Sequence, residues 1–189
     1  MKKIMSHNSW TFLKPIGFFA KIFNFTAKCQ DKNIQEQYEK YGVRMFDLRI
    51  RLNKNNKPVI AHGLFEYDAT NLTSDLNYLN TKRDVTIRVL LELRDGGDSQ
   101  KEWFIKYCSQ LWINYPNINF CGGYATCNNS KIYFKFTNPH PSCFGAHASC
   151  ITKNKLDDLW PKFFAFRNNW YYRKLDIEQE YLSLDFVNL

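Results

Sequence analysis

The segment "GVRMFDLRIRL", residues 42–52, limits the possible folds of this chain most strongly, because its apolar and charged residues alternate. Successive side chains of a β-strand point to opposite faces of the sheet. One face of this strand carries Phe46, Leu48, Ile50 and Leu52, and the opposite face carries Asp47, Arg49 and Arg51. The strand therefore needs an apolar layer on one side and, on the other, groups that interact with a carboxylate and two guanidinium ions.

Three further segments repeat this pattern: "VTIRVLLELR" (85–94), "KIYFKF" (131–136) and "YLSLDFVNL" (181–189). A sheet with one solvated face would account for it. The segment "SQKEWFIKYCSQLWINY" (99–115), however, has large apolar residues at helical spacing. Helices packed outside such a sheet would cover the apolar faces and leave the polar faces to converge inside a barrel.

The polar residues lie late in these strands, which favours a barrel of the (β/α)8 type, where reacting groups occupy the C-terminal strand ends. Such late positions are held by Asp47, Arg49, Glu92, Arg94 and Asp185. Strands are expected around residues 3–7, 43–51, 58–61, 85–93, 117–122, 131–136, 163–167 and 181–187. We predict an α/β fold, a compact and irregular (β/α)8 TIM-like barrel, in preference to an open sandwich. With no repeat or dividing linker, residues 1–189 are expected to form a single domain.

The charge and composition narrow the class of partner. A net charge of +8 favours an anionic partner, such as a phospholipid, a nucleic acid or a phosphorylated small molecule. The aromatic content of 17% and hydrophobic content of 44% argue against disorder. No apolar run is long enough to span a bilayer, and "MKKIMSHNSW" lacks the apolar region of a signal peptide. We expect a cytoplasmic or peripheral membrane protein, or a secreted one if the chain is a mature form.

The six cysteines leave the redox compartment open. A zinc cluster could be assembled from Cys121, Cys127, Cys143, Cys150, His140 and His147. The spacing contains no C-x2-C pair, however, and the loose "CGGYATC" and "CFGAHASC" segments are not typical of zinc sites. Free or partly disulfide-bonded thiols are the simpler interpretation.

Two of the four histidines lie where strands are expected to end. His7 follows a short apolar start in "MSHNSW", and His62 ends "KPVIAHG". A lone histidine is more often structural than catalytic, but this pair would lie beside Asp47 and Arg49. A general base and a general acid on either side of an arginine is the arrangement that phosphodiester cleavage needs, because the arginine holds the phosphoryl oxygens.

These segments resemble the X domain of phosphatidylinositol-specific phospholipase C. The family has a histidine followed by Asn or Asp and Ser, matched here by "SHNSW". A Gln-rich helix then leads into a G-[VC]-R-x-x-[DE]-x-[RD] strand, matched by "IQEQYEKYGVRMFDLR", and an H-G pair follows in "AHG". Order and spacing agree over residues 6–63. "VLLELR" and "LSLDFVN" also resemble family strands, whereas residues 95–180 match loosely.

The resemblance implies a role for each matched residue. His7 would be the general base that takes the proton of the inositol 2-hydroxyl, and Asp185 would hold its tautomer. His62 would protonate the departing diacylglycerol oxygen, with Asp47 beside it. Arg49 would bind the phosphate and stabilise its developing charge. The products would be diacylglycerol and inositol 1,2-cyclic phosphate.

The resemblance also implies substrate-binding residues and no cofactor. Glu92 or Arg94 would contact the inositol ring or the phosphate, and Lys135 and Arg167 are further candidates. Asn8 and Glu92 are similar to oxygen ligands of the calcium-dependent branch of the family, whereas Arg49 is similar to the metal-free bacterial branch. We therefore predict catalysis without a metal, with Asn8 as a substrate-binding residue.

The segment "FLKPIGFFAKIFNFTAK" (12–28) mixes phenylalanines with lysines. A core helix would have a similar composition. If the segment lies at the rim of the site, just after the first strand, its apolar and basic surface would suit shallow insertion into an anionic membrane. The expected partner is accordingly a phospholipid substrate at a membrane surface.

Three alternatives remain open from the residues alone. A glycerophosphodiesterase is also barrel-shaped, but this chain lacks its H-R-G start. A catalytically dead inositol-phospholipid-binding module is disfavoured because both histidines and Arg49 are present. A nucleic-acid binder has only the net charge in its favour, and the basic residues are dispersed rather than striped. We expect no nucleic acid and no obligate protein partner.

Overall fold

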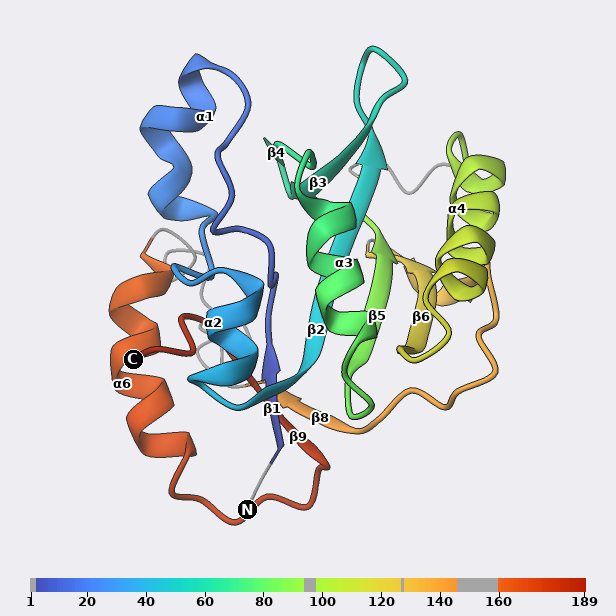
Figure 1. Cartoon of the computed structure of the whole chain (residues 1–189). Helices are drawn as coiled ribbons and strands as arrows, with labels where there is room; N and C mark the ends of the chain where they lie inside the picture. The colour runs from blue at the N-terminus through green and yellow to red at the C-terminus, as the bar shows by residue number, and fades with distance from the viewer. Residues whose placement is uncertain (1–2, 94–97, 127, 146–159) are drawn as a thin grey trace.

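A curled sheet runs through the molecule, and helices lie along its outer face (Figure 1). The computed structural model describes residues 3–93, 98–126, 128–145 and 160–189. The strands are β1 (Lys3–Ser6), β2 (Val43–Leu52), β3 (Pro58–His62), β4 (Phe65–Tyr67), β5 (Thr86–Leu91), β6 (Asn119–Ala125), β7 (Asn128–Ile132), β8 (Cys143–Gly145) and β9 (Tyr181–Leu184). The helices are α1 (Phe18–Phe23), the short 3-10 turn η1 (Asn24–Thr26), α2 (Ile34–Glu39), α3 (Leu72–Asn80), α4 (Lys101–Asn114) and α6 (Pro161–Tyr172).

The strand order is β7-β6-β5-β2-β1-β9-β8. From β6 to β8 all neighbours in this order are parallel, and β7 joins antiparallel to β6. The parallel strands therefore present their C-terminal ends at one edge of the sheet. The sequence analysis expected the reacting groups at this edge. Within the described ranges β7 and β8 are not paired with each other, so the sheet is a curled, open one and the expected closed barrel is not formed there.

One of the expected strands was wrong, one is confirmed but lies off the main path of the sheet, and one overlaps its expected range only at the start. Residues 58–61 do form a strand, β3, but it pairs antiparallel with β2 and β4 in a hairpin off the main path. Residues 163–167 lie inside helix α6, because Pro161 suits a first helical turn and the buried residues Ala165, Asn168 and Asn169 recur at helical spacing. The strand expected at 131–136 ends earlier, at Ile132.

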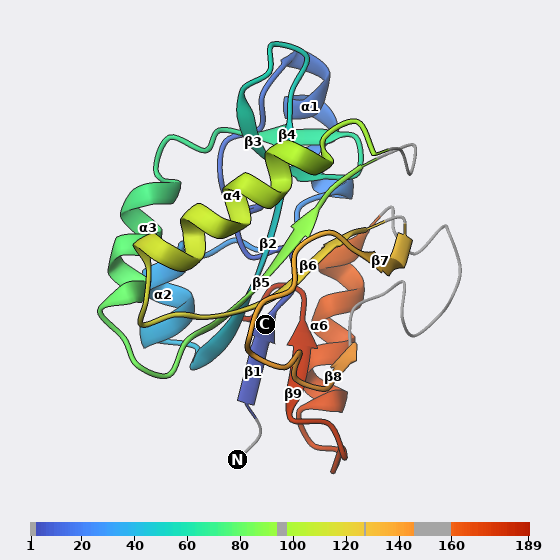
Figure 2. The same cartoon turned by 90° about the vertical axis from the view of Figure 1, so that its right-hand side faces the viewer.

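The helix expected over 99–115 is confirmed as α4, and it packs where the pattern placed it. Phe46, Leu48 and Ile50 of β2 join one buried cluster with Leu76 of α3 and Phe104 of α4. Figure 2 shows α3 and α4 along this outer face. The alternation in "GVRMFDLRIRL" thus separates the helix-covered face of the sheet from its inner face.

The inner face changes character along the strands. Met5, Met45, Cys121 and Tyr181 form a small apolar cluster near the N-terminal ends. Met45 shares its face of β2 with Asp47 and Arg49, which follow toward the C-terminal end. This apolar cluster fills the inside at one end and leaves the polar groups together at the other. No helix in the described part of the chain is both long and apolar enough to cross a lipid bilayer.

Candidate active site

His7 is held in place by the sharp turn that ends β1. Asn8 has a φ of 46°, a left-handed conformation that asparagine tolerates better than most residues. The Ser9 hydroxyl accepts a hydrogen bond from the Asp47 backbone N–H at 2.7 Å and donates one to the Ser6 carbonyl at 2.7 Å. The sequence "SHNS" is therefore fastened to β2, which carries the arginine of the site.

Gln30, which is fully buried, joins the ends of β1 and β9. Its side-chain Nε2 donates to the carbonyls of His7 at 3.0 Å and Leu184 at 2.9 Å, and its Oε1 accepts from the Val187 N–H at 3.1 Å. These bonds hold the backbone on which His7 and Asp185 stand. Gln30 is a positioning residue that the sequence reasoning did not select.

We expect Gln30→Ala to lower the free energy of unfolding by about 3 kcal/mol, because the His7 carbonyl and the Val187 N–H lose the bonds that Gln30 makes to them, each loss costing ~1–3 kcal/mol. Chemical denaturation of both proteins measures the difference. The control is Gln110→Ala, at an exposed position of α4, which should change stability little. A loss for Gln30→Ala no larger than that of the control would contradict this role.

His7 and Asp185 form a buried pair between β1 and the end of β9. Nδ1 of His7 lies 2.8 Å from Oδ1 of Asp185, and the two side chains are almost fully buried. Since a carboxylate can only accept, this contact makes Nδ1 the protonated nitrogen and leaves Nε2 with its lone pair. Burial first, and the neighbouring Arg49 guanidinium second, hold the pKa of His7 well below its ordinary value. His7 is therefore a neutral imidazole, with Nδ1 protonated and Nε2 as the acceptor.

Arg49 lies at the centre of the site. Its Nη2 is 2.7 Å from Nε2 of His7, its Nε donates to Oδ2 of Asp47 at 3.0 Å, and its Nη1 is 3.5 Å from Oε2 of Glu92. The guanidinium thus connects the proposed base to two carboxylates. A phosphate entering the site would compete with these partners for the guanidinium hydrogens.

The Asp47 carboxylate lies between two arginines, and the bonds described for it go to Arg49, Arg88 and Asn8 rather than to His62. Its Oδ1 accepts from Nε of Arg88 at 3.0 Å, opposite the bond from Arg49, and its Oδ2 also accepts from the Asn8 N–H at 3.1 Å. Burial alone would raise the pKa of Asp47, but Arg49 and Arg88 outweigh it and hold that pKa far below its ordinary value. Asp47 is a permanent anion that orients Arg49.

His62, at the end of β3, faces His7 across the site. The ring centroids are 6.1 Å apart and the rings are nearly perpendicular, at 81°. Nδ1 of His62 lies 2.7 Å from the Ala27 carbonyl, so Nδ1 carries the proton and Nε2 is the second reactive nitrogen. Burial and, after it, Arg49 lower the pKa of His62, against the opposing effect of that carbonyl.

Glu92 reaches the site from just beyond β5. Its Oε1 accepts from the Gly63 N–H at 2.9 Å, which ties it to the residue that follows His62. A pocket of about 500 Å³ opens beside it, and Arg51 and Gln100 share its lining. A buried Asn8 oxygen, Oδ1, and Oε2 of Glu92 have no hydrogen-bond partner in the described part of the chain. Unsatisfied polar atoms in such a place are typical of a site that binds a polar ligand.

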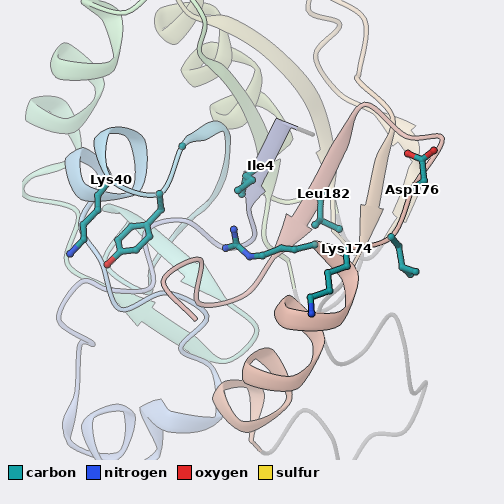
Figure 3. Close-up of a pocket in the computed structure, with 9 residues that line it drawn as sticks. Ile4, Lys40, Lys174, Asp176 and Leu182 are labelled. Atoms are coloured by element: carbon teal, nitrogen blue, oxygen red, sulfur yellow. The ribbon is translucent and has the colours of Figure 1, made fainter. Parts of the chain in front are cut away.

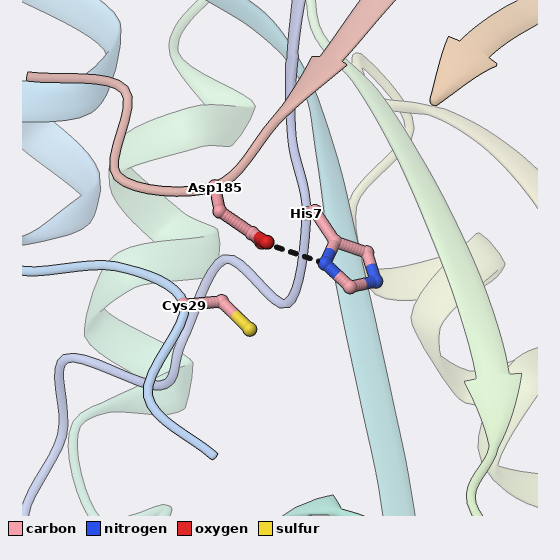
Figure 4. Close-up of side chains that lie close together, drawn as sticks. All are labelled: His7, Cys29 and Asp185. Atoms are coloured by element: carbon pink, nitrogen blue, oxygen red, sulfur yellow. Dashed lines mark hydrogen bonds and ion pairs between the residues drawn. The ribbon is translucent and has the colours of Figure 1, made fainter. Parts of the chain in front are cut away.

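One group of side chains has the composition of a metal site. His7, Cys29 and Asp185 place a nitrogen, a sulfur and a carboxylate oxygen within 4.8 Å of one another (Figure 4). Burial, with Asp185 beside it, raises the pKa of the Cys29 thiol well above its ordinary value, so this sulfur is protonated when no metal is bound. The sequence reasoning did not select Cys29, and its place next to both histidines had no sequence signal.

The remaining candidates lie apart from this cluster or outside the described residues. Lys135 is exposed and lines a small pocket with His140. Arg167 is exposed on α6, where its guanidinium lies over the Phe164 ring at 5.5 Å. Arg94 lies outside the described residues. The structure therefore brings together His7, Asn8, Asp47, Arg49, His62, Glu92 and Asp185, and not Lys135 or Arg167.

The C-terminal zinc cluster considered from the sequence cannot be assembled from the residues described. Cys121 and Cys143 are free thiols there, and burial raises the pKa of Cys121 to about 12 and that of Cys143 to about 11. Cys127, His147 and Cys150 lie outside the described residues.

Arg88 is the most important site residue that the sequence analysis did not select, although its signal was present. It occupies the polar face of "VTIRVLLELR" directly opposite Asp47 in the β2–β5 register.

A second pocket, of about 720 Å³, lies at the other end of the sheet. It is lined by residues from the N-terminal parts of β1 and β9, the turn between α2 and β2 and the chain after α6, including Ile4, Lys40, Lys174, Asp176 and Leu182 (Figure 3). None of the clustered histidines, arginines or carboxylates contributes to it. Reacting groups belong to the opposite strand ends in this class of fold, so we place the candidate active site at His7 and His62.

Comparison with known proteins bears on the fold of the chain. No family model matches the chain, and no curated protein sequence matches it. Two solved structures of the phosphatidylinositol-specific phospholipase C from Staphylococcus aureus are similar. One, a point mutant, is 13% identical with a TM-score of 0.56 and covers 97% of this chain and 84% of that chain. The other, from work on membrane binding of that enzyme, is 13% identical with a TM-score of 0.54, over 97% of this chain and 85% of that one. The chain thus has an α/β fold like that of this phospholipase.

Proposed function

We propose that the chain is a phosphoric diester lyase or hydrolase that cleaves phosphatidylinositol, or a related inositol phosphodiester, at a membrane surface. The observation that carries the proposal is the placement of two histidines beside Arg49, with ring centroids 6.1 Å apart: His7 follows the parallel strand β1, and His62 ends the antiparallel strand β3. The fold similarity supports it, as does the sequence motif over residues 6–63. We further infer that the curled sheet is an irregular variant of the (β/α)8 barrel.

His7 is the general base in this proposal. Asp185 holds Nδ1–H, so Nε2 presents its lone pair toward the substrate. In this structure the lone pair accepts a hydrogen bond from Arg49. When the phosphate draws the guanidinium away, Nε2 is released to take the proton of the inositol 2-hydroxyl. The oxygen then attacks phosphorus, and the new P–O bond closes the five-membered cyclic phosphate.

His62 is the general acid. Its Nδ1–H is held by the Ala27 carbonyl, so the proton delivered to the leaving diacylglycerol oxygen comes from Nε2. Burial lowers the pKa of His62 in the empty site. The negative charge of a bound phosphodiester offsets this effect, because a nearby anion favours the imidazolium. Substrate binding thus supplies the acid with its proton-bearing form.

Arg49 is the phosphate ligand, and Asp47 and Arg88 are positioning residues for it. The guanidinium offers a fixed positive charge and parallel N–H donors to the phosphoryl oxygens. Its interaction with these oxygens becomes stronger as negative charge develops on them in the transition state. Asn8, whose Oδ1 has no hydrogen-bond partner among the described residues, and Glu92, whose Oε2 has only the ion pair with Arg49, are the nearest candidates for contacts with the inositol hydroxyls.

The experiment that tests the function is direct. The protein is incubated with phosphatidylinositol in mixed micelles, and phosphorus NMR follows the products. A resonance of inositol 1,2-cyclic phosphate supports the proposal. Binding to inositol phospholipid without turnover would instead favour a catalytically inactive binding module.

An apolar surface near the site fits a membrane substrate. Helix α1 has no buried residue, so the core-helix alternative for this segment is wrong. Its phenylalanines Phe18 and Phe19 are 71% and 74% exposed. Figure 1 shows α1 projecting beyond the strand ends at which the histidines lie, and α6 on the same side of the molecule. The exposed apolar residues of this segment are Ile16, Phe18, Phe19, Ile22, Phe23 and Phe25, and helix α6 exposes Phe163, Phe166 and Trp170.

Replacing Phe18, Phe19 and Phe23 by serine is expected to weaken binding to anionic vesicles at least tenfold. Hydrolysis of soluble inositol cyclic phosphate should remain nearly unchanged, because these side chains contact lipid and not the reacting groups. Vesicle sedimentation and phosphorus NMR measure the two effects. The matched control is Ile113→Ser, which removes an equally exposed side chain on α4. Equal losses on both substrates, with a lower melting temperature, would show that the phenylalanines stabilise the fold.

A further inference from the structure

We propose that the pocket around His7 is also an inhibitory site for a thiophilic divalent cation, Zn²⁺ being the best fit, with Cys29, His7 and Asp185 as ligands. The inhibitory consequence rests on the function proposed above, whereas the binding does not. The proposal concerns a regulatory ion and leaves the catalytic step free of metal.

The geometry of the three side chains supports a shared ion. Their donor atoms lie within 4.8 Å of one another, and all three residues are more than nine-tenths buried. Zinc bonds of about 2.0–2.3 Å to nitrogen, oxygen and sulfur place two ligands roughly 3.5 Å apart in a tetrahedron. Side-chain rotations that close the group by about 1 Å would therefore suffice. Figure 4 shows the three side chains converging from separate segments of the chain.

Further donors surround this group. Nδ1 of His62 is 3.9 Å from the Cys29 sulfur, and the Asn8 amide nitrogen is 3.5 Å from the same sulfur. Asn8 is almost fully buried, and its Oδ1 has no hydrogen-bond partner in the described residues. An amide oxygen or the imidazole of His62 could complete a fourth position. This unsatisfied oxygen is a second observation, independent of Cys29, that points to a ligand in the pocket.

The donor types select zinc over calcium. Calcium takes about 6–8 oxygen ligands, whereas zinc is bound tetrahedrally by thiolate, imidazole and carboxylate. Binding releases the thiol proton of Cys29 to solvent, and the resulting thiolate together with Asp185 balances the two charges of the ion. Arg49 contacts His7 at Nε2, on the other ring nitrogen from Asp185. The fixed cation therefore lies on the far side of the imidazole from the proposed ion.

Coordination at this position would inhibit catalysis through the tautomer of His7. When Nδ1 binds the ion, the proton of the neutral ring moves to Nε2, and the Arg49 guanidinium, which donates to Nε2 in this structure, turns away from it. That nitrogen then donates and can no longer take a proton from the inositol hydroxyl. Asp185 is withdrawn from its role at the same time. One bound ion thus removes both members of the base pair.

Cobalt(II) provides a test that does not depend on activity. The full chain, reduced with a non-chelating phosphine, is titrated with CoCl₂, and near-ultraviolet absorption detects the thiolate-to-cobalt charge-transfer band. We expect a saturable one-to-one band that ZnCl₂ abolishes by displacement. Cys29→Ala should lose the band, whereas Cys143→Ala and the double variant Cys127→Ala/Cys150→Ala should keep it. The absence of a band in the parent, or its full retention in Cys29→Ala, would overturn the site.

The second arm uses turnover of phosphatidylinositol. ZnCl₂ should inhibit the parent, and EDTA should restore its activity. In Cys29→Ala, with rates expressed as fractions of that variant's own uninhibited rate, the half-inhibitory zinc concentration should be at least tenfold higher than in the parent. Inhibition with the same zinc dependence in Cys29→Ala would overturn the regulatory role. If Cys29→Ala does not fold, as a missing thermal transition would show, Cys29→Ser replaces it in both arms. A cobalt band in a protein without turnover would reject the proposed function and leave the metal site standing.

Discussion

Replacing His7 or His62 by alanine is expected to lower the rate of phosphatidylinositol cleavage by ~10²–10⁴ each, the usual effect of losing a general acid or base. The Nδ1 of His7 is bonded to Asp185 and the Nδ1 of His62 is bonded to the Ala27 carbonyl. Each ring therefore presents Nε2 to the substrate. The two losses should therefore appear in kcat, with a smaller effect on KM.

The control for this pair is His140→Ala. His140 is exposed and contacts Pro141 and Tyr124, away from the cluster. Its loss should leave turnover unchanged, and thermal unfolding should show that all three variants are folded. Near-parent turnover in folded His7→Ala or His62→Ala would show that the acid–base assignment is wrong.

The parts of the fold that the sequence could predict are those with strict periodicity. In β2 a shift of one residue would move Phe46 and Leu48 to the inner face, so the alternation determined both the strand and its orientation. The helix over 99–115 was equally clear, because its apolar residues recur at helical spacing. In both cases the pattern and the packing against the core point to the same solution.

Where the apolar pattern is ambiguous, the prediction failed for a physical reason. "FFAFRNNW" in α6 has aromatic residues that suit a strand, yet the exposed side is the aromatic one, with Phe163 and Phe166 facing solvent. The buried residues there include the polar Asn168 and Asn169. Asn169 is buried because it donates to the backbone carbonyls of Asp185 and Phe186, a long-range pairing that no local pattern reveals.

Some residues of the candidate site could likewise be predicted from the sequence, and others could not. Residues within the motif over 6–63 converge, and so does Asp185 at the end of the last strand, because parallel strands bring their C-terminal ends together. Cys29 and Gln30 also converge, but they lie in an irregular connection whose path depends on tertiary contacts. Arg88 could have been found, since an arginine facing Asp47 across two paired strands follows from the register alone.

The second large effect expected concerns Arg49 and metal ions. We expect full activity in EDTA or EGTA, and a loss of about 10³-fold or more in Arg49→Ala, comparable to removing a preorganised transition-state donor. The matched control is Arg44→Ala on the same strand, where the guanidinium pairs with Asp84 at the opposite end. That variant should keep its turnover, so a loss specific to Arg49→Ala reports on the phosphate.

The geometry explains why a catalytic calcium is disfavoured here. Asn8, Asp47 and Glu92 would supply its oxygens, but the Arg49 guanidinium lies among them, 3.0 Å from Oδ2 of Asp47 and 3.5 Å from Oε2 of Glu92. At ~4 Å and an effective dielectric constant near 20, each unit of like charge costs about 4 kcal/mol, so a divalent ion meets about twice that penalty. The arginine cannot avoid it by losing its proton at ordinary pH.

Arg49→Asp tests this reasoning in the opposite direction. The substitution removes the fixed cation and adds a carboxylate beside Asn8, Asp47 and Glu92, which gives a hard divalent ion an oxygen-rich site. The new carboxylate is also repelled by the carboxylates of Asp47 and Glu92, and a bound calcium ion would relieve that repulsion. The variant should therefore bind calcium even where its turnover is low. We expect it to be inactive in EGTA and to recover part of the activity when calcium is added. If the parent instead loses activity in EGTA and regains it with calcium, the ion and not the guanidinium neutralises the phosphate, and the mechanism proposed for Arg49 is wrong.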